Sequence, residues 1–157
     1  MASGQAATVD IVGTWRLVSV TRREVQTGRV TQPMGDKPTG YIVYTPAGRI
    51  FAMLFAETRP KSLSDENRAE LQRTAIAYSG TYTVDGTTAT HHVDMATTPE
   101  WVGSDQVRHF ELAHDRLTII SRPGPSAVDP LNVTDLQVVV TIVWERDERF
   151  SAPPHTF

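Results

Sequence analysis

Two short tryptophan-containing segments, one near each end of the chain, constrain the fold most strongly. Gly13-Thr14-Trp15 enters the first predicted strand, and Trp144-Glu145-Arg146 leaves the last. A glycine beside a tryptophan at the start of a β-rich chain is typical of a closed barrel whose floor is plugged by an indole. An arginine near the end of the final strand can lie across that indole as a cation–π lid. The two segments therefore predict a barrel, and such barrels often enclose a cavity for one small molecule.

Runs rich in β-branched and aromatic residues, separated by turn signals, predict eight strands in a single meander. Asp85-Gly86 is the strongest short hairpin turn, and Pro46-Ala47-Gly48 marks another. The predicted strands are Ile11–Val25, Gly40–Thr45, Arg49–Ala56, Gly80–Val84, Thr88–Met95, Gln106–Leu112, Arg116–Ser121 and Thr134–Arg146.

One helix is predicted between the third and fourth of these strands. Ser62 or Ser64 is its candidate N-cap, and Leu71, Ala75 and Tyr78 fall on one face before Gly80 stops it. The four links that do not form tight turns are long, and in a meander alternate links lie at the same end of a barrel. We therefore expect a closed end at Trp15 and an open mouth roofed by the helix and the long loops.

Composition limits the classes of protein that the chain can belong to. Its 157 residues fit one domain, and a formal charge of −3 with scattered Lys and Arg does not favour nucleic-acid binding. There is no cysteine, and the N-terminus lacks a basic start and an apolar segment. We expect a flexible arm over residues 1–9, a barrel domain over 10–148 and a loose tail over 149–157. The protein is predicted to be cytoplasmic, without membrane association and of open oligomeric state.

The chain resembles the lipocalin-like domain family of small bacterial and fungal proteins within the calycin superfamily. The resemblance rests on an ordered series of segments that span nearly the whole domain. These are Val12–Ser19, Gly40–Arg49, Gly80–Asp85, Thr90–Val93, Trp101–Phe110 and Val143–Arg146. It implies an all-β, eight-stranded antiparallel up-and-down barrel with one inserted helix. Some barrels of this general shape, found in natural-product pathways, resemble cofactor-free cyclases or isomerases.

The histidines do not predict a metal site. His91 and His92 are adjacent on a strand, so their side chains point to opposite faces and only one can enter the barrel. His109, His114 and His155 show no ligand spacing. Glycine-rich phosphate loops in a strand–helix context are also missing, so no metal, nucleotide or other cofactor is expected.

A candidate catalytic group comes from the hairpin around residue 100. If this hairpin is symmetric, His92 lies opposite Arg108 and Asp94 opposite Gln106. Arg108 would then stabilise an oxyanion, His92 would act as general acid or base, and Asp94 would orient either of them. A register slip of one residue would put His91 opposite Phe110 and this group would not form, so His91 replaces His92 as the candidate only if the register differs. The alternative is that Asp94 and Arg108 pair on the solvated outer face.

The sequence indicates six ligand-binding candidates. Tyr41 and Phe55 are expected near the mouth, and Trp101 lies in the loop at the mouth. The other three alternate on one face of a strand: Gln106, Arg108 and Phe110. The first hypothesis is a barrel that binds a small, largely apolar organic molecule, aromatic or polyketide-like, without chemistry. The second is a cofactor-independent isomerase, cyclase or lyase acting on such a molecule. A third is an oligomer-forming scaffold whose barrel is filled by side chains.

Overall fold

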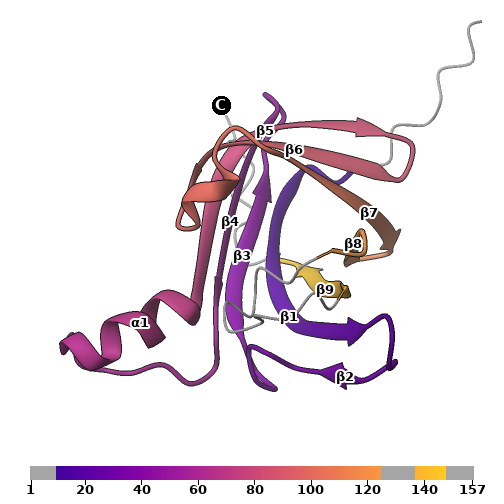
Figure 1. Ribbon diagram of the computed structural model, residues 1–157. Coiled ribbons are helices and arrows are strands. Elements are labelled where there is room, and N and C mark those ends of the chain that lie inside the picture. Colours follow the sequence, from indigo (N-terminus) through magenta and orange to yellow (C-terminus); the bar gives the residue numbers. More distant parts are fainter. Residues whose placement is uncertain (1–9, 125–136, 148–157) are drawn as a thin grey trace, which may run out of the picture.

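The computed structural model describes residues 10–124 and 137–147 of the chain, and Figure 1 shows them as a strongly bent, closed sheet. The expected N-terminal arm and C-terminal tail, and most of the link before the last strand, lie outside the described residues.

Eight of the nine strands form the barrel wall. The strands are β1 (Gly13–Glu24), β2 (Val30–Thr31), β3 (Thr39–Tyr44), β4 (Arg49–Phe55), β5 (Ala75–Asp85), β6 (Thr88–Ala96), β7 (Asp105–Ala113), β8 (Arg116–Ser121) and β9 (Val138–Arg146). The sheet order is β2-β1-β3-β4-β5-β6-β7-β8-β9, and an additional β1–β9 pairing closes the ring. All these pairings are antiparallel, so the predicted fold class is confirmed. The two-residue β2 was not predicted, and it pairs with Arg22 and Arg23 beyond the end of the β1–β3 ladder.

The floor of the barrel is built as the two tryptophan segments predicted. Trp15 is fully buried, and its Nε1 donates a hydrogen bond of 2.9 Å to the Ile11 carbonyl. The Arg146 guanidinium carbon lies 4.2 Å from the centre of the Trp15 ring, and Nη1 donates to the Val12 carbonyl at 3.2 Å. Gly13 has a φ of +134°, and a Cβ there would lie 3.0 Å from Arg146 Nη1. The glycine of the first segment is therefore needed both for its backbone conformation and for the arginine above it.

The tight turns lie together at this closed end. The backbone carbonyls of Gly48, Thr87 and Asp115 accept hydrogen bonds from the neighbouring strands at 3.0, 2.8 and 2.8 Å. Asp115 also lies 3.7 Å from Arg146, which links the β7–β8 turn to the floor. Because consecutive strands are antiparallel neighbours, the longer connections lie at the opposite end, as expected from their lengths.

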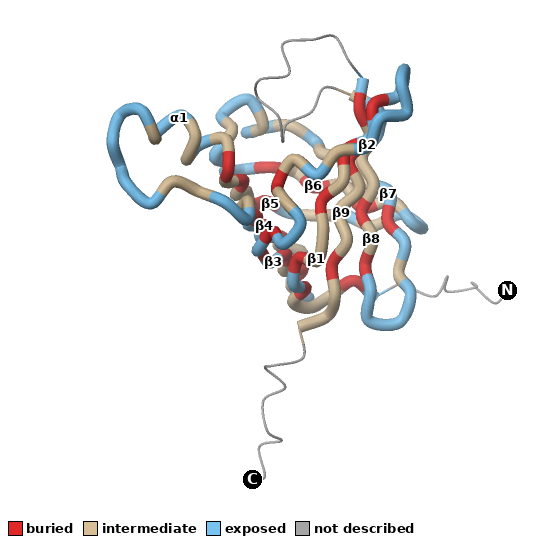
Figure 2. Tube along the Cα trace, turned by 90° about the horizontal axis from the view of Figure 1, so that it is seen from below, coloured by how far each residue is buried: buried red, intermediate tan, exposed pale blue. Residues whose placement is uncertain are grey.

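The helix differs from the prediction in length and position. Helix α1 spans Asp65–Arg73, and Ala75 and Tyr78 belong to strand β5 instead. Thr74 closes the helix because its hydroxyl and its amide both bond to the Glu70 carbonyl. No residue of α1 is buried, and Figures 1 and 2 show it projecting from the side of the barrel. The expectation that the helix roofs the mouth is wrong, because the cavity described below has no lining residue from α1.

We predict that Trp15→Ala lowers the free energy of unfolding by roughly 3–5 kcal/mol, the usual result of truncating a large buried aromatic side chain. Arg146→Ala should lower it less, because the Arg146 side chain is partly exposed and part of its contribution is the stacking on Trp15. Urea denaturation of the two variants and the wild type measures both losses. A loss below about 1 kcal/mol for Trp15→Ala would contradict the role of this indole as the floor of the core.

Candidate functional site

A cavity of about 340 Å³ lies inside the barrel. Its wall is mostly aliphatic, from Val20, Ile42, Leu54, Ile76, Ile119, Val138, Val140 and Ile142. Three aromatic residues complete it: Tyr78, Trp101 and Trp144. The described polar lining consists of Gln106, Arg108, Ser121 and Arg122, with the Gly124 backbone beside them. Such a wall suits a small organic molecule with one polar end.

Arg108 is the central charged group of the cavity. Its Nη2 donates to Gln106 Oε1 at 2.9 Å, and Nη1 donates to the Val107 carbonyl at 3.1 Å. Gln106 is held in turn, because its Nε2 donates to Ser104 Oγ at 2.9 Å. Within residues 10–124 and 137–147, no carboxylate forms an ion pair with Arg108. The guanidinium is therefore oriented by neutral groups and keeps its full positive charge beside an apolar space.

A buried histidine bridges two tyrosines next to this space. His91 is fully buried, and its Nε2 lies 2.9 Å from the Tyr44 hydroxyl. Its Nδ1 lies 3.0 Å from the hydroxyl of Tyr78, which lines the cavity. The Tyr78 ring also packs edge-on against Trp101, with ring centres 5.6 Å apart. The cavity wall and the barrel core are thus joined by one hydrogen-bonded chain of three side chains.

Burial sets the protonation of these three groups. Desolvation, together with a smaller effect of the nearby Arg108 charge, lowers the pKa of His91 from its ordinary value of 6.5 to about 3. Burial likewise raises the pKa of both Tyr44 and Tyr78. The imidazole is therefore neutral and the two phenols are protonated at neutral pH.

The predicted register of the β6–β7 hairpin is wrong by three residues. His91 pairs with Gln106, His92 with Asp105, and Ala89 with Arg108. An odd shift exchanges the two faces of a strand, so His91 points into the barrel and His92 points out. His92 Nδ1 instead lies 2.7 Å from Asp105 Oδ1, and its side chain is 38% exposed. The expected juxtaposition of His92 and Arg108 does not form.

Asp94 also lies on the outer face, where its carboxylate bonds to Arg49 at 2.7 Å and to Ser79 Oγ at 2.8 Å. The arginine and the serine lower the pKa of this carboxyl group. An irregularity in the β5–β6 ladder moves the partner of Ser79 to Met95 while Gly80 pairs with Val93, so Asp94 is the extra residue. A Cβ on Gly80 would lie only 2.0 Å from the His92 carbonyl, so glycine permits this close approach.

The six predicted ligand-binding residues divide into three groups. Trp101, Gln106 and Arg108 line the cavity. Phe110 is buried in the core but does not line it. Tyr41 and Phe55 belong to the outer face: Tyr41 is 42% exposed, and Arg59 stacks on the Phe55 ring at 4.6 Å. Their expected place at the mouth interior is wrong, because alternation along β3 and β4 turns Ile42 and Leu54 inward instead.

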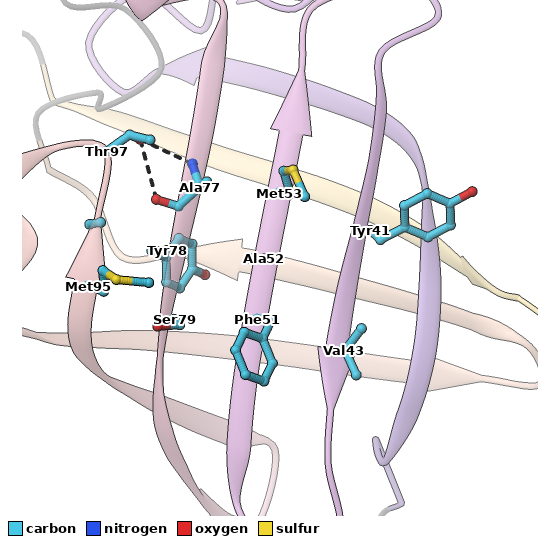
Figure 3. Close-up of a pocket in the computed structure, with 11 residues that line it drawn as sticks. Tyr41, Val43, Phe51, Ala52, Met53, Ala77, Tyr78, Ser79, Met95 and Thr97 are labelled. Atoms are coloured by element: carbon cyan, nitrogen blue, oxygen red, sulfur yellow. Dashed lines mark hydrogen bonds between the residues drawn. The ribbon is translucent and has the colours of Figure 1, made fainter.

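The outer face carries a second, shallower hollow that Figure 3 shows across β3, β4, β5 and β6. Tyr41, Phe51, Met53 and Met95 surround it and are 42–68% exposed. The surface that lines this hollow is almost entirely apolar, and its described lining residues include no arginine. The interior cavity is the better candidate site because polar groups converge only there.

Sequence reasoning missed three side chains of the site. Tyr44 is not among the predicted ligand-binding residues, Tyr78 falls on the predicted helix, and Trp144 enters only as part of the second tryptophan segment. Trp144 lines the cavity, and its buried indole Nε1 has no hydrogen-bond partner among the described residues. The alternation of Ile76 and Tyr78 ahead of Gly80 was the available signal, but it was interpreted as the end of a helix.

No group of three or more His, Asp or Glu side chains in the described part of the chain could hold a metal ion. None of the helices within it is long and apolar enough to cross a membrane.

Residues 12–147 match the family model described as the lipocalin-like domain. The chain belongs to this lipocalin-like domain family. The chain is also similar to the 4'-hydroxy-3'-methoxypropiophenone carrier protein ppsC of Aspergillus oryzae, with 28% identity over 96 residues. This alignment covers 56% of the chain and 81% of the Aspergillus protein.

Solved structures with similar folds include a lipocalin-like protein from Bacteroides uniformis, at 11% identity and a TM-score of 0.44. That match covers 87% of this chain and 97% of the other. A redesigned β-barrel matches at 15% identity and a TM-score of 0.42, over 87% of this chain and 91% of the design.

Burial of His91 makes the stability of this lipocalin-like protein depend on pH. Because the folded state holds the pKa near 3 and the unfolded state restores it to 6.5, only the unfolded chain takes up this proton between those values. Above pH 6.5 the free energy of unfolding carries no penalty from His91. It falls as the pH drops from 6.5 toward 3, by roughly 1 kcal/mol per pH unit. Urea unfolding at about pH 5 and about pH 7 measures this slope. His91→Gln should be less stable at pH 7 but should lose this part of the slope, and an unchanged slope would contradict the assignment.

Proposed function

We propose that this barrel binds and carries a small, largely apolar organic molecule, aromatic or polyketide-like, with a carbonyl or anionic oxygen near Arg108. One observation carries the proposal: an apolar cavity of about 340 Å³ has a guanidinium on its wall that pairs with no carboxylate of the described chain.

The size of the cavity limits the ligand. Small-molecule sites run from roughly 300 to 1,000 Å³, and a dry cavity of roughly 150 Å³ accepts benzene. A space of about 340 Å³ therefore suits one substituted ring or a short fused system rather than a long lipid. The aromatic rings of Trp101, Tyr78 and Trp144 offer faces and edges for such a ring.

The charge of the cavity favours an oxygen acceptor on the ligand. Arg108 and Arg122 line it, and none of its described lining residues is Asp or Glu. A guanidinium in a low-dielectric wall interacts more strongly with a carboxylate, phenolate or polarised carbonyl than it would in water. The similarity to a carrier protein named for a hydroxylated aryl ketone supports the same ligand class.

The site supports binding better than catalysis. Both ring nitrogens of His91 are engaged by tyrosine hydroxyls, and its pKa of about 3 makes it a poor base at neutral pH. His92 and Asp94, the other candidates for proton transfer, lie on the outer face. An isomerase, cyclase or lyase would need a base on the cavity wall, and no described lining residue supplies a carboxylate or a free imidazole. The scaffold hypothesis expects a filled barrel, which the cavity does not favour.

Native mass spectrometry of the protein purified from its own host tests the proposal without a chosen ligand. A carrier should retain one small molecule of unchanged mass per binding site. Incubation of the protein with that molecule, followed by its extraction, should return it unaltered. Conversion of the bound molecule to an isomer or a cyclised product would instead support the enzyme hypothesis.

A second experiment addresses the arginine. Arg108→Met should weaken binding of 4'-hydroxy-3'-methoxypropiophenone by roughly 10-fold or more, the loss expected for a charge-assisted hydrogen bond. Quenching of the fluorescence of Trp101 and Trp144 reports the binding, because both rings line the cavity.

Two control variants match this substitution. Arg116→Met removes an exposed arginine of β8 that does not line the cavity, and His92→Ala removes the outer histidine. Both should bind the probe like the wild type. Equal losses for Arg116→Met and Arg108→Met would mean that the probe binds by overall charge rather than inside the barrel.

A further inference from the structure

The chain Tyr44–His91–Tyr78 connects the core of the barrel with its cavity. Tyr44 is 1% exposed and His91 is fully buried, whereas Tyr78 lines the cavity and touches Trp101. Two hydrogen bonds of 2.9 and 3.0 Å join the three side chains through the two nitrogens of one imidazole. A neutral imidazole has one N–H donor and one bare acceptor, so the protons of this chain can run in only two directions.

Burial of Tyr44 selects the direction. Within the described residues, His91 Nε2 is the hydrogen-bond partner of the Tyr44 hydroxyl. If Nε2 carried the proton and donated to Tyr44, the buried Tyr44 O–H would have no acceptor among the described residues. Tyr44 therefore donates to Nε2, the proton of the ring sits on Nδ1, and Nδ1–H donates to the Tyr78 oxygen. The Tyr78 O–H is then left to donate to another acceptor, and Tyr78 lines the cavity.

The other polar groups of the cavity wall are donors too. The Trp144 Nε1–H has no acceptor among the described residues. Arg108 carries only donors, and the one acceptor offered by the Gln106 side chain is already used by Arg108. Ser121 Oγ accepts from the Val140 amide, so its own O–H is also a donor. A ligand that enters this cavity meets N–H and O–H groups, and few acceptors.

We propose that the Tyr44–His91–Tyr78 chain fixes Tyr78 as a hydrogen-bond donor, so that the cavity selects ligands by an acceptor oxygen, a carbonyl or a deprotonated oxygen, placed between Tyr78 and Arg108. This inference rests on the proposed binding function and adds a rule of selection to it. Tyr78 and Arg108 contact the ligand, whereas Tyr44 and His91 act only as positioning residues. Because the buried imidazole, whose pKa is about 3, stays neutral at ordinary pH, one of its nitrogens remains an acceptor for the Tyr44 hydroxyl.

Two probes of the same shape test the rule: 4-hydroxypropiophenone and 4-propylphenol, which differ in a carbonyl in place of a methylene. The wild type should bind the ketone more tightly than the alkylphenol. Tyr78→Phe should weaken ketone binding by roughly 3- to 10-fold, the effect of one neutral hydrogen bond, and should weaken alkylphenol binding less, so that the ratio of the two affinities falls toward one. Tyr82→Phe is the matched control, because Tyr82 follows on the same strand but donates to the Thr45 carbonyl and does not line the cavity.

The proton positions have a readout that needs no ligand and no variant. Nitrogen-15 NMR of the wild type should show His91 as a neutral ring protonated on Nδ1. In Tyr44→Phe, which does not reach the cavity, the ring should lose this single tautomer. The preference of that variant for the ketone over the alkylphenol should fall with it, although no ligand contact has been removed.

The outcomes distinguish the selection rule from the carrier function. The wild type could bind both probes with equal affinity, or His91 could carry its proton on Nε2. Either result would overturn the proposed role of the Tyr44–His91–Tyr78 chain and leave the carrier function standing. Failure of the wild type to bind either probe would overturn the selection rule and also count against the carrier function. A ketone preference that survives Tyr78→Phe would assign the selection to Arg108 alone and reject the role of Tyr78.

Discussion

The antiparallel pairing of β1 with β9 is the constraint on which the rest of this structure depends. It joins residues more than 110 positions apart, from Trp15 with Arg146 to Glu24 with Val138. The pairing removes both free edges of the sheet, so the barrel has a closed interior with its own low dielectric. The stack of Arg146 on Trp15 seals one end of that interior, and the tight turns gather around it. Without this closure the same strands would form an open sheet, and His91 and Arg108 would face water.

Two irregularities then decide which side chains enter the interior. In β1 the ladder shifts between Leu17 and Ser19, so Val20, Arg22 and Glu24 become buried in place of their odd-numbered neighbours. In the β5–β6 ladder a second shift leaves Asp94 and Met95 outside. A single inserted residue reverses the facing of everything beyond it, because side chains alternate along a strand. Which polar side chains face the cavity therefore depends on these two register shifts as much as on residue type.

The interior combines an apolar wall with donors that are held in place by neutral partners. Gln106 orients Arg108 without cancelling its charge, and His91 orients Tyr78 without taking a charge of its own. In the proposed carrier function, this arrangement would stabilise an oxygen acceptor, and because it offers no strong base we propose that it holds an aryl ketone or phenolate rather than transforming it.

The sequence by itself determined the strand count of the barrel wall, its closure, the Trp15–Arg146 floor and the family, because these follow from local patterns and from motifs at fixed positions. It also placed Trp101, Gln106 and Arg108 in one region. It could not determine which of two adjacent histidines faces inward, since a strand register depends on pairings across a loop whose geometry is not local. The wrong register put His92 and Asp94 in the site, and the misjudged end of the helix hid Tyr78. Only the tertiary structure brought Tyr44, His91 and Tyr78 together, because β3, β5 and β6 must curve around one interior before these side chains can meet.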